Sequence, residues 1–267
     1  MLTQSGFQDG VHRLSLVVAA LFAAWALACA GCRERPAPLT ATEPIAQGAP
    51  PSSDQEQEYA RRRATMIAEH LAARDITDKR VLAAMERVPR HEFVPPRQRH
   101  RAYVDAPMSI GHGQTISQPY IVALMTQLAE PRADAKALDI GTGSGYQAAV
   151  LAELVKNVYS IEIVEPLAAD ARRRLQSLGY KNIQVRHGDG YLGWPEEAPF
   201  DVIIVAAAPD HIPAALIEQL APGGKMLIPV GQGAQDLLIV EKGEDGAVTQ
   251  QRAAPVAFVP MTGEAQR

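Results

Sequence analysis

The sequence predicts an α/β fold, a doubly wound and mostly parallel sheet with an antiparallel edge hairpin and a small helical region before it. From Ala137 onward, short apolar runs alternate with helical patterns, and such alternation requires a parallel sheet with helices on both faces. A glycine-rich turn, residues 141–145, joins the first run to the first helix. A late apolar run, 237–241, is followed by glycines at 243 and 246, which predict a hairpin turn. The expected architecture is therefore Rossmann-like.

The individual elements follow from the spacing of apolar residues. Ala60, Ile67 and Leu71, and then Val81 and Met85, recur at helical intervals and predict two N-terminal helices, the second ending before Pro89. The expected strands are residues 137–140, 158–162, 183–186, 202–205, 225–230 and 237–241, and the expected helices between them include 146–154 and 166–178.

The first residues have the pattern of a targeting segment. His12 and Arg13 precede an apolar run, 14–30, that is too short for a comfortable membrane span. Small residues then lead to Cys32, a pattern similar to a bacterial lipoprotein signal, in which this cysteine is lipidated and becomes the mature N-terminus. We expect export and membrane attachment through Cys32; an uncleaved hydrophobic anchor and an upstream extension are the alternatives.

The domain organisation follows from these segments. Residues 1–32 are expected to be the signal-like leader, and 33–57, rich in Pro, Ala, Ser and Gln, a disordered tether. Residues 58–262 are expected to form the folded domain, with its N-terminal helices, and 263–267 a tail.

Charge and residue composition argue against a nucleic-acid partner and against a metal site. The net charge of −4 and pI near 6.0 give no electrostatic footprint for nucleic acid. The two cysteines, Cys29 and Cys32, lie in the leader, and the seven histidines show no His-x-x-x-His spacing. We therefore expect neither a nucleic-acid partner nor a metal site.

The glycine loop predicts the cofactor. Its spacing is G-x-G-x-G after an acidic strand end, which is typical of S-adenosylmethionine binding; a dinucleotide fingerprint would need a glycine where Tyr146 stands. Glu162 ends the next strand and can accept the ribose hydroxyls, and Asp189 follows the third strand, where it can meet the adenine amino group. The expected cofactor-binding residues are Asp139, Gly141, Thr142, Gly143, Ser144, Gly145, Glu162, Asp189 and Gly190. Residues 58–262 are therefore expected to be a class I methyltransferase domain.

Two kinds of methyl acceptor are excluded by what the chain lacks. Enzymes that methylate a planar amide or adenine amine use an Asn-Pro-Pro-aromatic turn after the fourth strand, where this chain has residues 206–209, Ala-Ala-Ala-Pro. A cytosine-C5 enzyme needs a cysteine nucleophile, and the expected domain contains no cysteine.

A family resemblance narrows the reaction further. Residues 110–119, Ile-Gly-His-Gly-Gln-Thr-Ile-Ser-Gln-Pro, resemble the active-site stretch of the protein-L-isoaspartate O-methyltransferase family. The resemblance extends over about residues 60–262 and includes the segments 81–85, 90–95, 102–105, 141–149, 188–190, 222–224 and 228–231.

The resemblance implies a repair reaction on isoaspartyl peptides and proteins. The free α-carboxylate of an L-isoaspartyl residue is methylated, and the ester then collapses to a succinimide without the enzyme. Such a carboxylate is already ionised at pH 7, so the site needs orientation more than a general base. The family is typically cytoplasmic, whereas the leader indicates a periplasmic or membrane-anchored protein.

The resemblance also assigns roles to single residues. It makes Ser117 the catalytic residue, whose hydroxyl holds the carboxylate, although Ser117 could instead be the N-cap of the helix that follows Pro119. It also implies peptide-binding roles for Thr115, Ile116, Pro229 and Val230, and a cofactor contact for Thr262. Two alternatives stay open: a methyltransferase for a small-molecule carboxylate, and a catalytically idle exported binding protein.

Overall fold

The computed structural model describes residues 52–263. The expected leader, most of the expected tether and residues 264–267 of the tail lie outside this range, as does Cys32. Within residues 52–263, no helix has the length and apolar character needed to cross a membrane.

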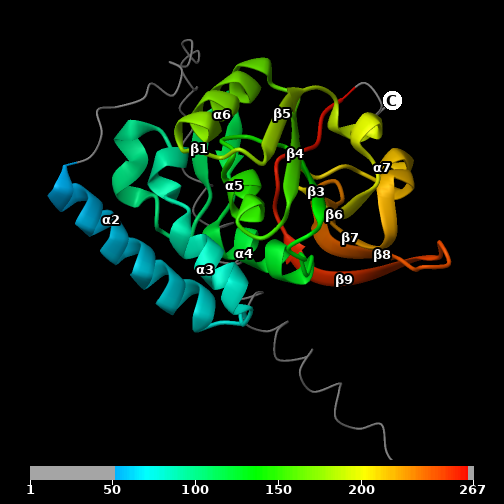
Figure 1. The fold of residues 1–267 in the computed structure, drawn as a ribbon, viewed down its shortest axis with the longest axis horizontal. Coiled ribbons are helices and arrows are strands. Elements are labelled where there is room, and N and C mark those ends of the chain that lie inside the picture. The colour runs from blue at the N-terminus through cyan, green and yellow to red at the C-terminus, as the bar shows by residue number, and fades with distance from the viewer. Residues whose placement is uncertain (1–51, 264–267) are drawn as a thin grey trace, which may run out of the picture. The chain divides into compact units, whose positions relative to one another are not determined.

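The described residues form a seven-stranded sheet with the order β5-β4-β3-β6-β7-β8-β9 (Figure 1). The five strands from β5 to β7 are parallel, and β8 and β9 add an antiparallel edge hairpin, so the expected fold class is confirmed. The strands are β3 Lys136–Ile140, β4 Asn157–Glu162, β5 Ile183–His187, β6 Phe200–Val205, β7 Leu220–Val230, β8 Gln235–Lys242 and β9 Val248–Val256. The chain runs outward from β3 in one direction through β4 and β5, then returns to β6 on its other side, which opens a crevice at the carboxyl end of β3.

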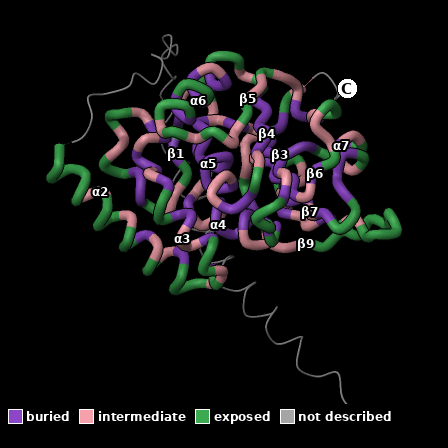
Figure 2. The backbone as a smooth tube through the Cα atoms, in the orientation of Figure 1, coloured by how far each residue is buried: buried purple, intermediate pink, exposed green. Residues whose placement is uncertain are grey.

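Two apolar cores lie on the two faces of this sheet, because successive strand residues point to opposite sides. Ala137 of β3 belongs to the core beneath helices α4 and α5, whereas Leu138 and Ile140 belong to the core that contains Leu216 of α7. Figure 2 shows that the chain is buried at the central strands. The helices that cover the sheet are α4 Pro119–Leu128, α5 Tyr146–Ala152, α6 Glu165–Ser177 and α7 Ala214–Gln219.

The N-terminal region is helical, and its first helix begins earlier than residue 58. A reciprocal capping box between Ser52 and Gln55 starts this helix inside the range expected to be a tether. The α-helix α2 exposes most of its surface, and none of its residues is buried (Figure 2). The elements are α2 Ser53–Thr65, a π-helical segment Met66–Ala72, α3 Lys79–Arg87, 3₁₀ turns Arg90–Phe93 and Pro96–Arg101, and a hairpin of β1 Met108–Gly111 and β2 Gln114–Ile116.

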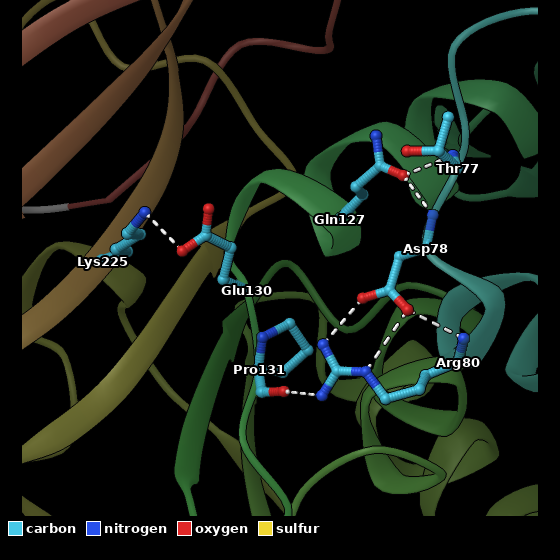
Figure 3. A network of polar contacts seen from close by, with 7 residues as sticks. All are labelled: Thr77, Asp78, Arg80, Gln127, Glu130, Pro131 and Lys225. Atoms are coloured by element: carbon cyan, nitrogen blue, oxygen red, sulfur yellow. Dashed lines mark hydrogen bonds and ion pairs between the residues drawn. The ribbon is translucent and has the colours of Figure 1, made fainter.

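Polar contacts attach this region to the sheet domain (Figure 3). The Gln127 side chain of α4 accepts hydrogen bonds from the backbone N–H groups of Thr77 and Asp78 at 2.7 and 2.8 Å, just before α3. Arg80 of α3 pairs with Asp78 at 2.7 Å and donates to the Pro131 carbonyl at 2.9 Å. These bonds fix the helical region against α4, and thereby the chain that leads into the hairpin.

Candidate active site

A pocket opens at the carboxyl ends of β3 and β4, in the crevice where the direction of the chain reverses. Its empty volume is about 780 Å³, open solvent at its mouth included. Its lining brings together ten of the residues that the sequence singled out: Thr115, Ile116, Ser117, Gly141, Thr142, Gly143, Ser144, Glu162, Gly190 and Thr262. Asp139, Gly145, Asp189, Pro229 and Val230 are not among the lining residues.

The glycine loop forms one wall, and its backbone is left-handed at three positions. The φ angles of Gly141, Gly143 and Gly145 are 90°, 53° and 92°, which side chains rarely adopt. A Cβ at Gly143 would also lie 3.2 Å from Cδ1 of Ile110 in β1. At Gly145 a Cβ would meet Leu175 of α6 at 3.2 Å, so this glycine serves helix packing and does not face the pocket.

Glu162 holds the loop by accepting two backbone hydrogen bonds. One carboxylate oxygen accepts from the N–H of Gly143 at 2.7 Å, and the other accepts from the N–H of Val164 at 2.9 Å. The side chain is buried and still lines the pocket. Each oxygen keeps further acceptor capacity, so the carboxylate can also receive the two hydroxyl protons of a vicinal diol.

Asp139 supports the loop from below. It is fully buried and accepts a hydrogen bond from the Ser160 hydroxyl at 2.7 Å; Ser160 in turn bonds the Thr142 hydroxyl at 2.5 Å. Burial is the main cause that raises the pKa of the Asp139 carboxyl to about 7. Asp139 therefore acts on the pocket through Thr142.

Asp189 and Gly190 shape the far side of the pocket. Asp189 caps a 3₁₀ turn, Gly190–Leu192, by accepting from the Tyr191 N–H at 2.9 Å. Gly190 lines the pocket, where a Cβ would lie only 2.4 Å from Cγ2 of Ile140. The Asp189 carboxylate lies against the backbone at Gly263, where a Cβ would come within 2.3 Å of its oxygen.

Ser117 lies on the opposite wall, between β2 and α4, and its hydroxyl has no hydrogen-bond partner among residues 52–263. The interpretation of Ser117 as a helix cap is wrong. The N-cap of α4 is Gln118, which makes no side-chain cap bond. Asp105, which lies earlier in the chain, caps the helix. Its carboxylate accepts from the backbone N–H of Tyr120 at 3.0 Å and from the side-chain amide of Gln118 at 2.7 Å. The Ser117 hydroxyl is therefore available to the pocket.

The C-terminal segment closes the pocket beside Thr262. Two backbone bonds join it to Ala208 after β6: the Ala208 N–H donates to Val259 at 2.9 Å, and the Met261 N–H donates to Ala208 at 2.8 Å. The Gln235 side chain clamps Phe258 through both its N–H and its carbonyl, at 2.6 and 3.0 Å. This segment contributes Val259, Pro260, Met261 and Thr262 to the lining.

Arg90, Asp105 and Gln235 hold the pocket walls, and no pattern in the sequence predicts this role for them. Arg90 and Asp105 do occur in segments that resemble the family, and this was the one signal available for them. The described residues 52–263 contain no group of three His, Cys, Asp or Glu side chains that could hold a metal ion.

The doubly wound sheet, its glycine loop and the acid that ends the neighbouring strand define the class I methyltransferases. A family model described as protein-L-isoaspartate(D-aspartate) O-methyltransferase matches residues 61–266. The chain therefore belongs to the protein-L-isoaspartate(D-aspartate) O-methyltransferase family.

Sequence relatives and solved structures agree with this assignment. The chain is 61% identical over 189 residues to protein-L-isoaspartate O-methyltransferase 2 of Polaromonas sp., covering 70% of this chain and 90% of that one. It is 54% identical over 220 residues to protein-L-isoaspartate O-methyltransferase of Synechococcus sp., covering 79% and 90%. A solved protein-L-isoaspartate O-methyltransferase superposes with a TM-score of 0.69 at 27% identity, covering 75% of this chain and 66% of that one. A putative family member from Plasmodium falciparum, in complex with S-adenosyl-L-homocysteine, superposes with a TM-score of 0.66 at 26% identity, covering 75% and 98%.

Proposed function

We propose that this protein transfers the methyl group of S-adenosylmethionine to the free α-carboxylate of L-isoaspartyl residues in damaged proteins and peptides, which initiates their repair. The observation that carries the proposal is the position of Ser117. Ser117, whose hydroxyl has no hydrogen-bond partner among residues 52–263, lines the same pocket as the glycine loop and Glu162, in a chain of this family.

The residues of the pocket fit this cofactor. Glu162 presents carboxylate oxygens to a ribose diol, and the left-handed glycines let the loop backbone approach a ligand closely. None of the residues that line the pocket is Lys, Arg or His, and the one acid among them is Glu162, so the lining suits a cationic sulfonium. When bound, S-adenosylmethionine supplies the electrophilic methyl group. Thr142, Ser144, Gly190 and Thr262 complete the proposed cofactor site, supported from below by Asp139 and Gly145 and at the side by Asp189.

The protein's own contribution is orientation of the acceptor. The acceptor carboxylate is ionised at neutral pH and needs no general base. The Ser117 hydroxyl would donate to this carboxylate and orient it toward the bound cofactor, and Ile116, Ile140 and Val122 supply apolar lining beside it. Thr115 and Ile116 are the proposed peptide contacts inside the pocket, and Pro229 and Val230, which end β7, are the proposed contacts outside its lining.

Matched peptides test this function. The protein should methylate a peptide that contains L-isoaspartate, and the same peptide with normal aspartate should be nearly inert, because a misplacement of about 1 Å costs on the order of 100-fold in rate. The measurement is transfer of a labelled methyl group to each peptide. Equal methylation of both peptides would overturn the repair function.

We further propose that the protein is exported and attached to the membrane through a lipidated Cys32. The support is the sequence of the leader, in which basic residues, a short apolar run and small residues precede this cysteine. Stable anchoring requires more than one acyl chain, as a lipoprotein provides. Mass spectrometry of the membrane fraction should find a mature chain that begins at Cys32, and Cys32→Ala should block processing. Recovery of an unprocessed chain from the cytoplasm would contradict the proposal.

A further inference from the structure

Two buried arginines donate to the two walls of the pocket in the same way. Arg90 donates to the Ser117 carbonyl at 2.7 Å, and Arg174 of α6 donates to the Ser144 carbonyl at 2.8 Å. Ser117 and Ser144 both line the pocket. Arg90 is completely buried, and Arg174 is 8% exposed.

The surroundings of the two guanidinium groups differ. Arg90 also donates to the Ala102 carbonyl at 2.8 Å, its Cζ lies 4.7 Å from the centre of the Tyr146 ring, and its Nη1 has no partner in the described chain. The side chains of Tyr146, Asp105 and Tyr103 interact with its charge. Of these, Asp105 alone is an acid, and it already accepts the bonds that cap α4 and pairs with Arg74 at 3.3 Å. Two carbonyls and an aromatic face therefore hold the Arg90 cation, with little acidic compensation.

Two acids, in contrast, act on the charge of Arg174. Asp170 of the same helix and Glu92 of the 3₁₀ turn Arg90–Phe93 act on Arg174, although these acids pair with Arg173 and Arg99, whose charges oppose them. The position of Arg174, behind the glycine loop, also places it on the cofactor side of the pocket. The two arginines can therefore be compared directly, because each donates a similar hydrogen bond to a different wall of the pocket.

The lining of the pocket explains why a cation behind Ser117 matters. The one formal charge among the lining residues is the Glu162 carboxylate, which repels an anionic acceptor. A buried charge acts strongly over short distances because the protein interior screens it poorly. Arg90 bonds the Ser117 carbonyl and lies over the ring of Tyr146, and both of these residues line the pocket.

We propose that Arg90 is a positioning residue of the acceptor wall: it fixes Ser117 through the Ser117 carbonyl, and its buried charge favours the ionised carboxylate of the substrate. This inference rests on the proposed function. It makes Arg90 the reason why the site prefers a charged acceptor.

The first experiment exchanges each arginine for lysine. Lysine keeps the charge but cannot reproduce the two-carbonyl fork of Arg90. Arg90→Lys should lower kcat/KM for an isoaspartyl peptide by about tenfold and leave the dissociation constant of S-adenosylhomocysteine within twofold. Arg174→Lys should raise the dissociation constant of S-adenosylhomocysteine several-fold, because Arg174 holds the wall that carries the glycine loop. Unchanged peptide kinetics in Arg90→Lys, or equal effects of both variants on cofactor affinity, would overturn the positioning role.

The second experiment removes the charge with Arg90→Gln. Binding of an isoaspartyl peptide is compared with binding of the same peptide carrying an isoasparaginyl amide, at saturating S-adenosylhomocysteine, which also stabilises the folded variant. The wild-type protein and Arg90→Lys should prefer the carboxylate, and Arg90→Gln should lose about tenfold of this preference. A purely structural role would weaken both peptides equally, and that result would reject the electrostatic part of the proposal. Should Arg90→Gln not fold, the lysine pair still decides the positioning role.

The same assays separate this inference from the proposed function. If the wild-type protein fails to methylate isoaspartyl peptides, the proposed function is wrong. If it methylates them and the Arg90 variants behave like the wild type, this inference alone is wrong.

Discussion

The two walls of the pocket are built on different principles. The glycine-loop wall consists of backbone at the ends of adjacent parallel strands, and Glu162 joins the two strand ends by accepting from Gly143. The Ser117 wall is an irregular segment that side chains from distant turns hold in place, above all Arg90 and Asp105. The first wall is therefore specified by the fold itself, whereas the second depends on single polar contacts. Substitutions should accordingly affect cofactor affinity on one wall and turnover on the other.

The largest expected effect is that of Glu162→Ala on the glycine-loop wall. The variant loses the acceptor for the proposed ribose contact, and it also leaves the N–H groups of Gly143 and Val164 without their partner. We expect binding of S-adenosylmethionine to weaken by about 1.5–3 kcal/mol, the usual contribution of a hydrogen bond to a charged group. Calorimetry measures the affinity, and Glu162→Gln, which keeps one acceptor oxygen, should lose less. Undiminished affinity in a folded Glu162→Ala variant would exclude this residue from the cofactor site.

The next largest effect is expected for Ser117→Ala on the opposite wall. The hydroxyl makes no bond within the described residues, so the melting temperature should stay close to that of the wild type. Turnover of the isoaspartyl peptide should fall by about 10- to 100-fold, because an acceptor shifted out of line reacts much more slowly. S-adenosylhomocysteine should bind as before. A variant with full turnover would show that Ser117 is not catalytic.

A smaller effect is expected at the C-terminal segment. Gln235→Leu removes both bonds to Phe258 and loosens the segment that carries Thr262. We expect the free energy of unfolding to fall by about 1–2 kcal/mol and cofactor affinity to fall several-fold. The matched control is Gln232→Leu, because Gln232 is exposed and makes one long bond, 3.4 Å, to Asp210. If both variants behave alike, the clamp on Phe258 does not support the pocket.

The difference between the walls also decides what the sequence could predict. The strands, the glycine loop and Glu162 were predictable because apolar periodicity locates strand ends, and parallel strand ends meet at one edge of a sheet. The lining segment 259–261 and the cap from Asp105 were not predictable, because they depend on contacts between residues far apart in the sequence. Ser117 shows what local sequence alone cannot predict. Its position before Pro119 predicts a helix cap, and the remote carboxylate of Asp105 takes that role in the structure.

The smallest change in activity is expected for Asp139→Asn, which should instead alter how the free energy of unfolding depends on pH. Its carboxyl has a pKa of about 7 in the folded protein because it is buried, against about 3.9 in an unfolded chain. Between these two values the folded state binds more protons than the unfolded state, so the contribution of Asp139 to stability is complete below about pH 4 and is lost as the pH rises to about 7. Asp139→Asn keeps an acceptor for the Ser160 hydroxyl and cannot ionise, so it should remove this part of the pH dependence.

Unfolding measured in denaturant at several pH values tests this expectation. Relative to the wild type, the Asp139→Asn variant should gain more than about 1 kcal/mol of stability between about pH 5 and pH 8, since each unit of pKa shift corresponds to about 1.4 kcal/mol. Cofactor affinity at about pH 6 should change by less than about threefold, because Asp139 reaches the pocket only through Ser160 and Thr142 and a neutral side chain preserves that chain of bonds. Parallel stability curves for the variant and the wild type would show that Asp139 keeps one protonation state throughout this range. The glycine-loop wall would then owe its shape to Glu162 and the backbone, with no contribution from a titrating group beneath it.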